Sequence, residues 1–162
     1  MITFENLYKD VSPKVSGEIK AFWLKEGALD GERRREERVK QAVYIIRHSE
    51  SGKLVGVSTA QKTKFKALND NYFYEFRCYI GEGHRAAGLD VKLSKITIDF
   101  LESISQEDAD KPIGVFATLE NEHLKKEAYW RRAFWPENRM YFVGYTSAGN
   151  PIRVRYFKGA RI

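Results

Sequence analysis

The chain has 162 residues, of which 43% are hydrophobic and 14% aromatic, a composition that supports one buried core and gives no sign of a second. The formal net charge of +6 favours an anionic partner, but it does not choose between nucleic acid, a phosphorylated cofactor and simple solubility. The single cysteine, Cys78, excludes an internal disulfide, and neither an apolar run of about 20 residues nor a secretory signal is present. We therefore expect one compact domain over residues 1–162 in a soluble, cytoplasmic protein that does not contact a membrane.

The first 40 residues are predicted to form a short strand and two helices. The strand is expected over residues 2–8. A helix follows from Pro13 to about residue 26, because apolar side chains recur there at helical spacing and Gly27 can end the helix. The mixed-charge run over residues 29–38 predicts a solvated second helix with internal ion pairs, and a basic patch that contacts a substrate or a phosphate is the alternative.

Three antiparallel strands are predicted next. Residues 42–48 and 53–60 are rich in β-branched and aromatic side chains, and the glycine-containing turn between them indicates a hairpin. After a polar spacer, residues 72–80 form the third strand. Its even-numbered residues share one face that belongs to the core, and its odd-numbered residues, among them Glu75, share the face that carries groups capable of chemistry.

A glycine-containing turn over residues 81–88 leads from this strand into an amphipathic helix over residues 89–104. Such an order directs backbone N–H groups and the helix dipole toward one point, which favours an anion. A strand over residues 112–118, parallel to the third strand, a helix over 121–134 and two strands over 140–145 and 152–157 complete the chain. The element order predicts a mixed α/β (α+β) fold.

The turn and the following helix carry a recognisable motif. The run Arg85-Ala-Ala-Gly88-Leu89-Asp90 resembles the pattern (Gln/Arg)-x-x-Gly-x-(Gly/Ala) that binds the pyrophosphate of acetyl-coenzyme A (acetyl-CoA) in the GCN5-related N-acetyltransferase (GNAT) superfamily. A later motif of that family is echoed by Asn121, Tyr129, Ala133 and Phe134. The resemblance implies a single-domain GNAT-like acyl-CoA N-acyltransferase fold, with a mostly antiparallel sheet of about six to seven strands and helices on both faces.

The resemblance also implies an activity, which is direct transfer of an acetyl group from acetyl-CoA, or from another acyl-CoA, to a primary amine. In that case the strand end would pair with the pantetheine arm and the loop N–H groups would hold the pyrophosphate, helped by the charge of Arg85. Asn121 would hydrogen-bond the cofactor arm, or act only as a helix N-cap. The residues so implied in cofactor binding are Cys78, Tyr79, Ile80, Arg85, Ala86, Ala87, Gly88, Leu89, Asp90 and Asn121.

Two residues are candidates for catalysis. Glu75 projects from the strand beside the expected cofactor path and could take a proton from the amine, and an ion pair with Arg77 is the alternative. Tyr129 lies where the family often has an acid near the coenzyme sulfur, and a place in an aromatic core is the alternative. Backbone N–H groups near Tyr79 would stabilise the oxyanion.

Other chemistries are less well supported by the sequence. His84 and His123 have no partner at a metal-ligand interval, so we expect no metal, and Cys78 is expected to be a buried structural thiol. Asp90 replaces the family's glycine or alanine near the phosphates. It leaves three alternatives open, namely a weakened coenzyme site, a different acyl carrier or a scaffold that has lost the cofactor.

The alternative from another class of function is a non-catalytic GNAT-like binding module. Basic and aromatic residues alternate over residues 125–135 and further basic residues follow at Arg153, Arg155, Lys158 and Arg161, as in proteins that bind nucleic acid or an acidic protein. Nucleic acid is possible but less favoured than an amine acceptor, either a small molecule or a protein. Both functions would hold if the acceptor were carried on nucleic acid or on an acidic protein. The strand-rich carboxyl end makes a homodimer reasonable.

Overall fold

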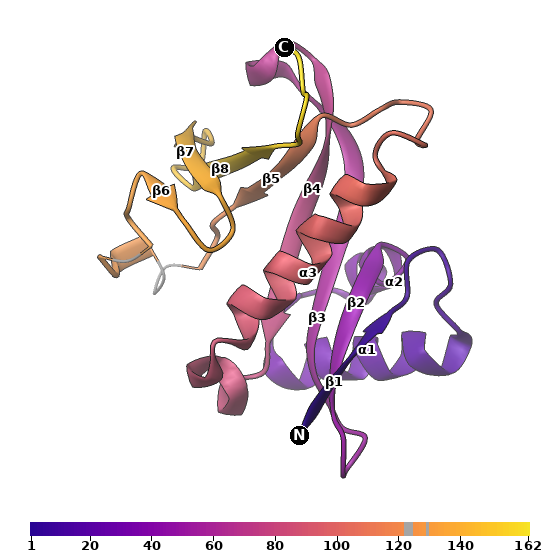
Figure 1. Ribbon diagram of the computed structural model, residues 1–162. Helices are drawn as coiled ribbons and strands as arrows, with labels where there is room; N and C mark the ends of the chain where they lie inside the picture. Colours follow the sequence, from indigo (N-terminus) through magenta and orange to yellow (C-terminus); the bar gives the residue numbers. More distant parts are fainter. Residues whose placement is uncertain (122–124, 129) are drawn as a thin grey trace. The chain divides into compact units, whose positions relative to one another are not determined.

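The computed structural model describes residues 1–121, 125–128 and 130–162, and its strands form one mixed sheet (Figure 1). The strand order is β1-β2-β3-β4-β5-β8-β7-β6, and β4 and β5 pair in parallel. The elements are β1 (Ile2–Asn6), α1 (Pro13–Glu26), α2 (Glu32–Val39), β2 (Ala42–His48), β3 (Leu54–Phe65), the 3-10 helix η1 (Lys66–Leu68), β4 (Asn71–Ile80), the 3-10 helix η2 (Glu82–Ala87), α3 (Leu89–Ile104), β5 (Gly114–Thr118), β6 (Phe134–Trp135), β7 (Met140–Tyr145) and β8 (Pro151–Tyr156). None of the helices in the described residues has the length and apolar character needed to cross a membrane.

The expected α+β fold with a mixed, mostly antiparallel sheet is confirmed, although the sheet formed by the described residues has eight strands and not six to seven. The additional strand is β6, which lies where the sequence predicted the end of a helix over residues 121–134. That prediction was wrong for its last part, because Phe134 pairs with Tyr141 and Trp135 with Met140 across the sheet. Pro136 directly after β6 also disfavours helical backbone at the residue before it.

The chain folds into two compact units. Unit 1 comprises Met1–Ala60 and Cys78–Thr97, and unit 2 comprises Gln61–Arg77 and Ile98–Ile162. The chain passes from one unit to the other three times, inside β3, inside β4 and inside α3.

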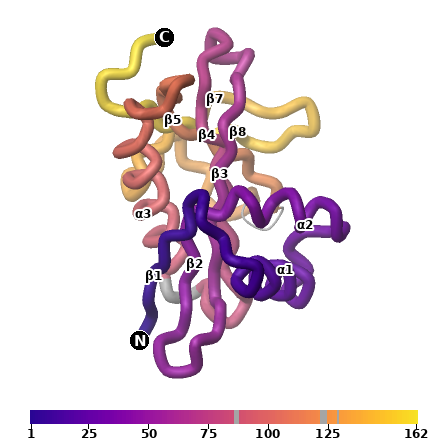
Figure 2. The backbone as a smooth tube through the Cα atoms, turned by 90° about the vertical axis from the view of Figure 1, so that its right-hand side faces the viewer, coloured from indigo at the N-terminus to yellow at the C-terminus, as the bar shows by residue number. Residues whose placement is uncertain are grey.

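In unit 1, α1 begins and ends where its sequence signals stand. The Ser12 hydroxyl accepts a hydrogen bond from the N–H of Val15 at 3.3 Å, and Gly27 closes the helix in the left-handed conformation. The helix lies beside α2, as Figure 2 shows. It buries Ile19, Phe22 and Trp23 in a cluster completed by side chains of α2, β2 and β3.

The other face of the strands in unit 1 packs against α3. Leu89 and Leu93 of this helix join Ile46, Val55 and Ile80 in a second cluster. A buried hydrogen bond of 2.7 Å between the hydroxyls of Ser58 and Thr97 satisfies polar groups at the same interface. Helices therefore cover both faces of the sheet in this unit, as predicted.

Unit 2 has an aromatic core on one face of its strands. Phe73 of β4, Phe116 of β5 and Val154 of β8 are buried together, and Phe65 stacks on Phe116 with the ring centroids 4.5 Å apart. Part of β3 contributes to this core, because β3 continues to Phe65 where the sequence predicted a polar spacer after Ala60.

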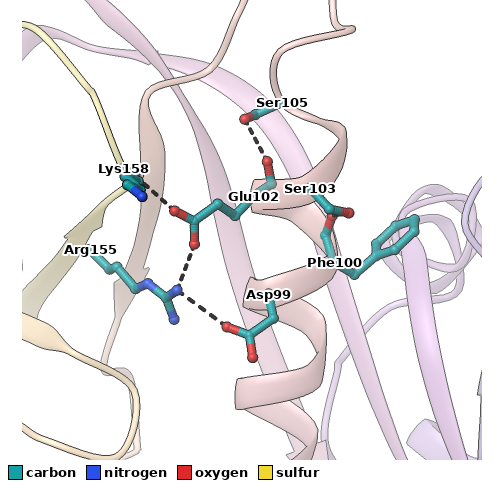
Figure 3. Close-up of polar contacts among 7 residues, drawn as sticks. All are labelled: Asp99, Phe100, Glu102, Ser103, Ser105, Arg155 and Lys158. Atoms are coloured by element: carbon teal, nitrogen blue, oxygen red, sulfur yellow. Dashed lines mark hydrogen bonds and ion pairs between the residues drawn. The ribbon is translucent and has the colours of Figure 1, made fainter.

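On the opposite side of β8 in unit 2, ion pairs join the strand to α3. Arg155 donates hydrogen bonds to Asp99 at 3.2 Å and to Glu102 at 2.7 Å, and Glu102 also accepts from the N–H of Lys158 at 2.8 Å (Figure 3). The arginine side chain is only 10% exposed, so these bonds are partly shielded from water.

Candidate functional site

The expected anion site is built by the junction of η2 and α3 in unit 1. Gly88 adopts the left-handed conformation with φ of 64°, which ends η2 and allows α3 to begin at Leu89. The first helical bond there is from the N–H of Lys92 to the carbonyl of Gly88 at 3.2 Å, so the N–H groups of residues 89–91 precede the helical ladder. A Cβ atom at Gly88 would meet no atom within 4 Å, and a phosphate can therefore approach this backbone.

The edge of β4 offers a second set of backbone groups. Near the end of β4, the backbone N–H and C=O groups of the odd-numbered residues point toward β3. The N–H of Gly81 donates to the carbonyl of Val55, and the carbonyl of Tyr79 lies close to Gly56. The backbone groups of the even-numbered residues point toward β5, because the carbonyl of Tyr72 accepts from the N–H of Ile113 at 2.9 Å. The β4–β5 ladder consists of Tyr74–Val115 and Glu75–Phe116 in the described residues, so the backbone groups of Cys78 and Ile80 lie beyond it.

Arg85 is folded back over the end of β4. Its Nε donates to the carbonyl of Ile80 at 3.1 Å, and one of its terminal nitrogens donates to the hydroxyl of Tyr79 at 2.8 Å. The Tyr79 hydroxyl in turn donates to the backbone carbonyl of Glu26 at 3.3 Å, and the Glu26 carboxylate accepts from the N–H of Glu82 at 2.9 Å. These bonds connect the end of α1 to the loop before α3.

An open pocket of about 700 Å³ lies over this network, lined by Lys25, Glu26, Glu82, Gly83 and Arg85. Its walls carry both charges, so the pocket suits a ligand with polar groups of both signs. The sequence singled out Arg85 but missed Glu26, because nothing in the sequence indicates that the end of α1 meets this loop.

Cys78 is held as a neutral thiol. Its sulfur lies 4.0 Å from the backbone carbonyl of Asp90, and the thiol is half-buried. Loss of hydration is the main cause that raises the pKa of Cys78 to about 12; a hydrogen bond with Ser94 opposes this rise, and the Asp90 charge adds a smaller contribution to it. A thiol with this pKa is a poor nucleophile at neutral pH.

Asp90 stands in the first turn of α3, and it is its backbone carbonyl that meets the Cys78 thiol. An acidic residue in the first turn of α3 also complements the helix dipole.

Glu75 lies in unit 2 within a polar network. One of its carboxylate oxygens accepts from Arg77 at 2.5 Å and the other from the side-chain amide of Gln61 at 2.7 Å. Arg77 also donates to Glu120 at 3.4 Å. The Glu75 side chain is 16% exposed, so its contacts with Arg77 and Gln61 are partly shielded from water.

The predicted site residues are thus divided between the two units. Unit 1 holds the implied coenzyme-binding residues from Cys78 to Asp90, and unit 2 holds Glu75 and Asn121. Asn121 is exposed, and its carbonyl accepts from the N–H of Lys125 at 3.2 Å, which fits an N-cap. Tyr129 and the side chains of Ala86 and Ala87 lie outside the described residues.

Gln61 is the second functional side chain that the sequence did not reveal. It was part of the expected spacer, but the β alternation continues through it, and extending that alternation from Thr59 would have placed it beside the third strand. Where the chain is described, no three His, Cys, Asp or Glu residues are grouped in a way that could hold a metal ion.

Solved structures share this architecture over almost the whole chain. The acetyltransferase of the GNAT family from Streptococcus pneumoniae matches with a TM-score of 0.64 and 12% identity, covering 97% of this chain and 99% of that chain. NAA60 from Arabidopsis thaliana in complex with acetyl-CoA matches with a TM-score of 0.64 and 12% identity, covering 97% and 100%. The ribosomal-protein-S18-alanine N-acetyltransferase from Escherichia coli matches with a TM-score of 0.63 and 12% identity, covering 99% and 97%.

No family model matches the sequence, and no curated protein matches it. The structural likeness establishes that the chain has the fold of the GNAT acetyltransferases, as the motif around Gly88 predicted.

Proposed function

We propose that this protein transfers an acetyl group from acetyl-CoA to a primary amine by direct attack of the amine. One observation carries the proposal: Gly88 is left-handed with open space beside it, and it begins α3 after the short η2 segment that follows the end of β4. This combination offers N–H groups to a pyrophosphate and strand groups to an extended amide chain. Because the GNAT fold is shared with acetyltransferases, acetyl-CoA is the ligand that suits both features.

The residues of unit 1 fit acetyl-CoA, which would supply an acetyl group activated as a thioester. The N–H groups from Arg85 to Asp90 and the dipole of α3 would hold the pyrophosphate. Cys78 and Ile80 would pair with the pantetheine amides, since their backbone groups face away from β3. Arg85 would reach a phosphate only by leaving Ile80 and Tyr79.

In unit 2, Glu75 would take the proton that the acceptor ammonium must lose before it attacks. An oxygen of this carboxylate would accept that proton while Gln61 keeps its orientation. Tyr129 would give a proton to the departing thiolate. Since Cys78 remains a neutral thiol, we propose attack by the amine itself and no acyl-enzyme on this cysteine.

Ligand-dependent thermal stability tests the proposal. If acetyl-CoA binds with a micromolar dissociation constant, 1 mM ligand stabilises the fold by roughly 4 kcal/mol, a rise in melting temperature on the order of 10 °C. Replacing Gly88 by Asn, which tolerates the left-handed conformation but fills the open space, should abolish most of this rise. Gly83→Ala in the same loop is the matched control, because Gly83 lacks a positive φ and its added Cβ meets nothing within 4 Å.

The same measurement of ligand-dependent thermal stability, made on Asp90→Asn, tests the effect of the Asp90 charge. Asp90→Asn keeps the size of the side chain and removes a carboxylate from the neighbourhood of the phosphates, so it should strengthen binding. A melting temperature that does not respond to coenzyme A, acetyl-CoA or longer acyl forms in the unmodified protein would refute the proposed function.

A further inference from the structure

The net positive charge of the chain is concentrated at its carboxyl end. Residues 119–162 contain nine lysines and arginines against four glutamates, which leaves five of the six net charges in this segment. The whole segment belongs to unit 2. Neither the proposed coenzyme loop nor Glu75 lies in it, so the proposed acetyl transfer does not account for this charge.

The same segment exposes large apolar side chains. Tyr141, Val143 and Tyr145 of β7 are 55%, 44% and 66% exposed, and Phe134 and Phe142 are 37% exposed. Phe134 packs against Tyr141 with the ring centroids 4.6 Å apart, and Phe142 against Tyr145 at 5.0 Å. A contiguous set of exposed rings on one hairpin marks an interaction surface.

Arginines flank this hairpin, which consists of β6 and β7. Arg139 is exposed in the turn between the two strands. Arg131 and Arg132 are exposed just before β6, where the N–H of Phe142 bonds the carbonyl of Ala133 at 2.8 Å and keeps the chain alongside β7. Cationic groups therefore lie in the turn of the hairpin and just before β6.

A buried arginine supports the hairpin from behind. Arg153 of β8 is 2% exposed, lies 3.9 Å from the ring centroid of Trp135 and donates to the carbonyl of Trp130 at 2.7 Å. Burial lowers the pKa of Arg153 to about 10, so the group remains a cation at neutral pH. These contacts hold Trp135 of β6 to β8.

We propose that the β6–β7 hairpin binds single-stranded nucleic acid, with bases stacked on Tyr141 and Tyr145 and phosphates near the flanking arginines. Exposed rings provide stacking platforms for bases of any sequence, and arginines neutralise the backbone. An acidic polypeptide would satisfy the charge, but its carboxylate side chains offer no aromatic ring to stack on the exposed rings. The proposal stands apart from acetyl transfer and needs no bound coenzyme.

The test measures binding of fluorescein-labelled oligo(U) of 12 nucleotides by anisotropy, without acetyl-CoA. Oligo(dT) of the same length distinguishes RNA from DNA as the source of the strand, and a 12-base-pair duplex tests for single-strand preference. Polyglutamate of 12 residues tests charge alone. With three phosphates neutralised, binding should weaken about 20-fold between 50 and 200 mM salt, and the duplex and polyglutamate should compete at least tenfold more weakly than oligo(U).

Matched variants separate stacking from charge. Tyr145→Ser should weaken oligo(U) binding about tenfold, whereas Tyr145→Phe, which keeps the ring, should bind as the unmodified protein does. Arg139→Glu should weaken binding and reduce the salt dependence, while Arg34→Glu, the same charge change on the exposed face of α2 in unit 1, should have at most a small effect. Circular dichroism checks that each variant is folded.

Three results would overturn the proposal. The first is equal binding by Tyr145→Ser and Tyr145→Phe, which would leave the rings without a role. The second is polyglutamate competing as well as oligo(U), which would assign the surface to an acidic protein. The third is a dimer that forms without nucleic acid and is lost in Tyr145→Ser, which would show that a second copy of the chain covers the rings.

Discussion

At the scale of single residues, Glu75 has two compatible roles. It forms an ion pair with Arg77, and the contact with Gln61 of the neighbouring strand β3 orients its side chain. An ion pair alone would make Glu75 a structural residue, as the spacing of Glu75 and Arg77 on one strand face already indicated. If Glu75 is the proton acceptor, the rate of acetyl transfer must depend on its carboxylate and not only on the ion pair with Arg77.

Two substitutions distinguish these roles. Glu75→Gln keeps the shape but removes the basic group, so turnover should fall about 100-fold with little change in coenzyme affinity. Arg77→Met removes the partner and leaves the carboxylate, so turnover should stay within about threefold. The measurement is release of coenzyme A thiol in the presence of an amine acceptor. Equal losses in both variants would identify the ion pair as structural and exclude Glu75 as the base.

The candidate site was predictable from sequence only where local signals exist. The glycine-containing turn between a strand and an amphipathic helix identified the region of Gly88, because the left-handed residue and the helix start are local features. The Glu26 and Gln61 contacts depend on which distant elements pack together, and no spacing in the chain encodes that. Conversely, the fold of Arg85 back onto Tyr79 was not expected from its place in the motif.

At the scale of elements, α3 is the helix whose ends serve different purposes. Its start forms the candidate anion site in unit 1, and its last turns hold β8 in unit 2 through Arg155. The two carboxylates that receive Arg155 differ in their surroundings. Glu102 is 27% exposed and also accepts from the backbone of Lys158, whereas Asp99 is 43% exposed (Figure 3).

Because Glu102 is the less exposed carboxylate and also accepts from the backbone of Lys158, its removal should be the more costly. Glu102→Ala should lower the free energy of unfolding by about 2 kcal/mol, since it leaves the N–H of Lys158 and one side of Arg155 unsatisfied. Asp99→Ala, one turn earlier on the same helix, should lower it by about 0.5 kcal/mol. Urea denaturation measures both. A larger loss for Asp99→Ala would contradict this order.

Element boundaries were predictable where capping residues mark them. The bounds of α1 follow from Ser12, Pro13 and Gly27, and α3 runs over the residues predicted for it. β6 and the last residues of β3 were missed for a common physical reason. Both are stabilised by neighbouring strands, and β propensity is weak when a run is as short as Phe134–Trp135 or as polar as residues 61–64.

At the scale of the whole molecule, the two units are not separate segments of the chain. Each is assembled from two stretches, and each crossing between the units falls inside a strand or a helix. Neither unit can lose its structure without breaking elements that the other also uses. The single domain expected from the sequence therefore leads to a prediction of cooperative unfolding.

Amide hydrogen exchange tests this cooperativity. Ile45 is fully buried in unit 1, so Ile45→Ala should destabilise the fold by about 3 kcal/mol, and if unfolding is cooperative the protection of β8 amides in unit 2 should fall by the same free energy. Val154→Ala, in the core of unit 2, should reduce the protection of β2 amides in turn. Val143→Ala, on the exposed face of β7, is the control and should leave both strands protected. Loss of protection confined to the substituted unit would show that the two units unfold independently.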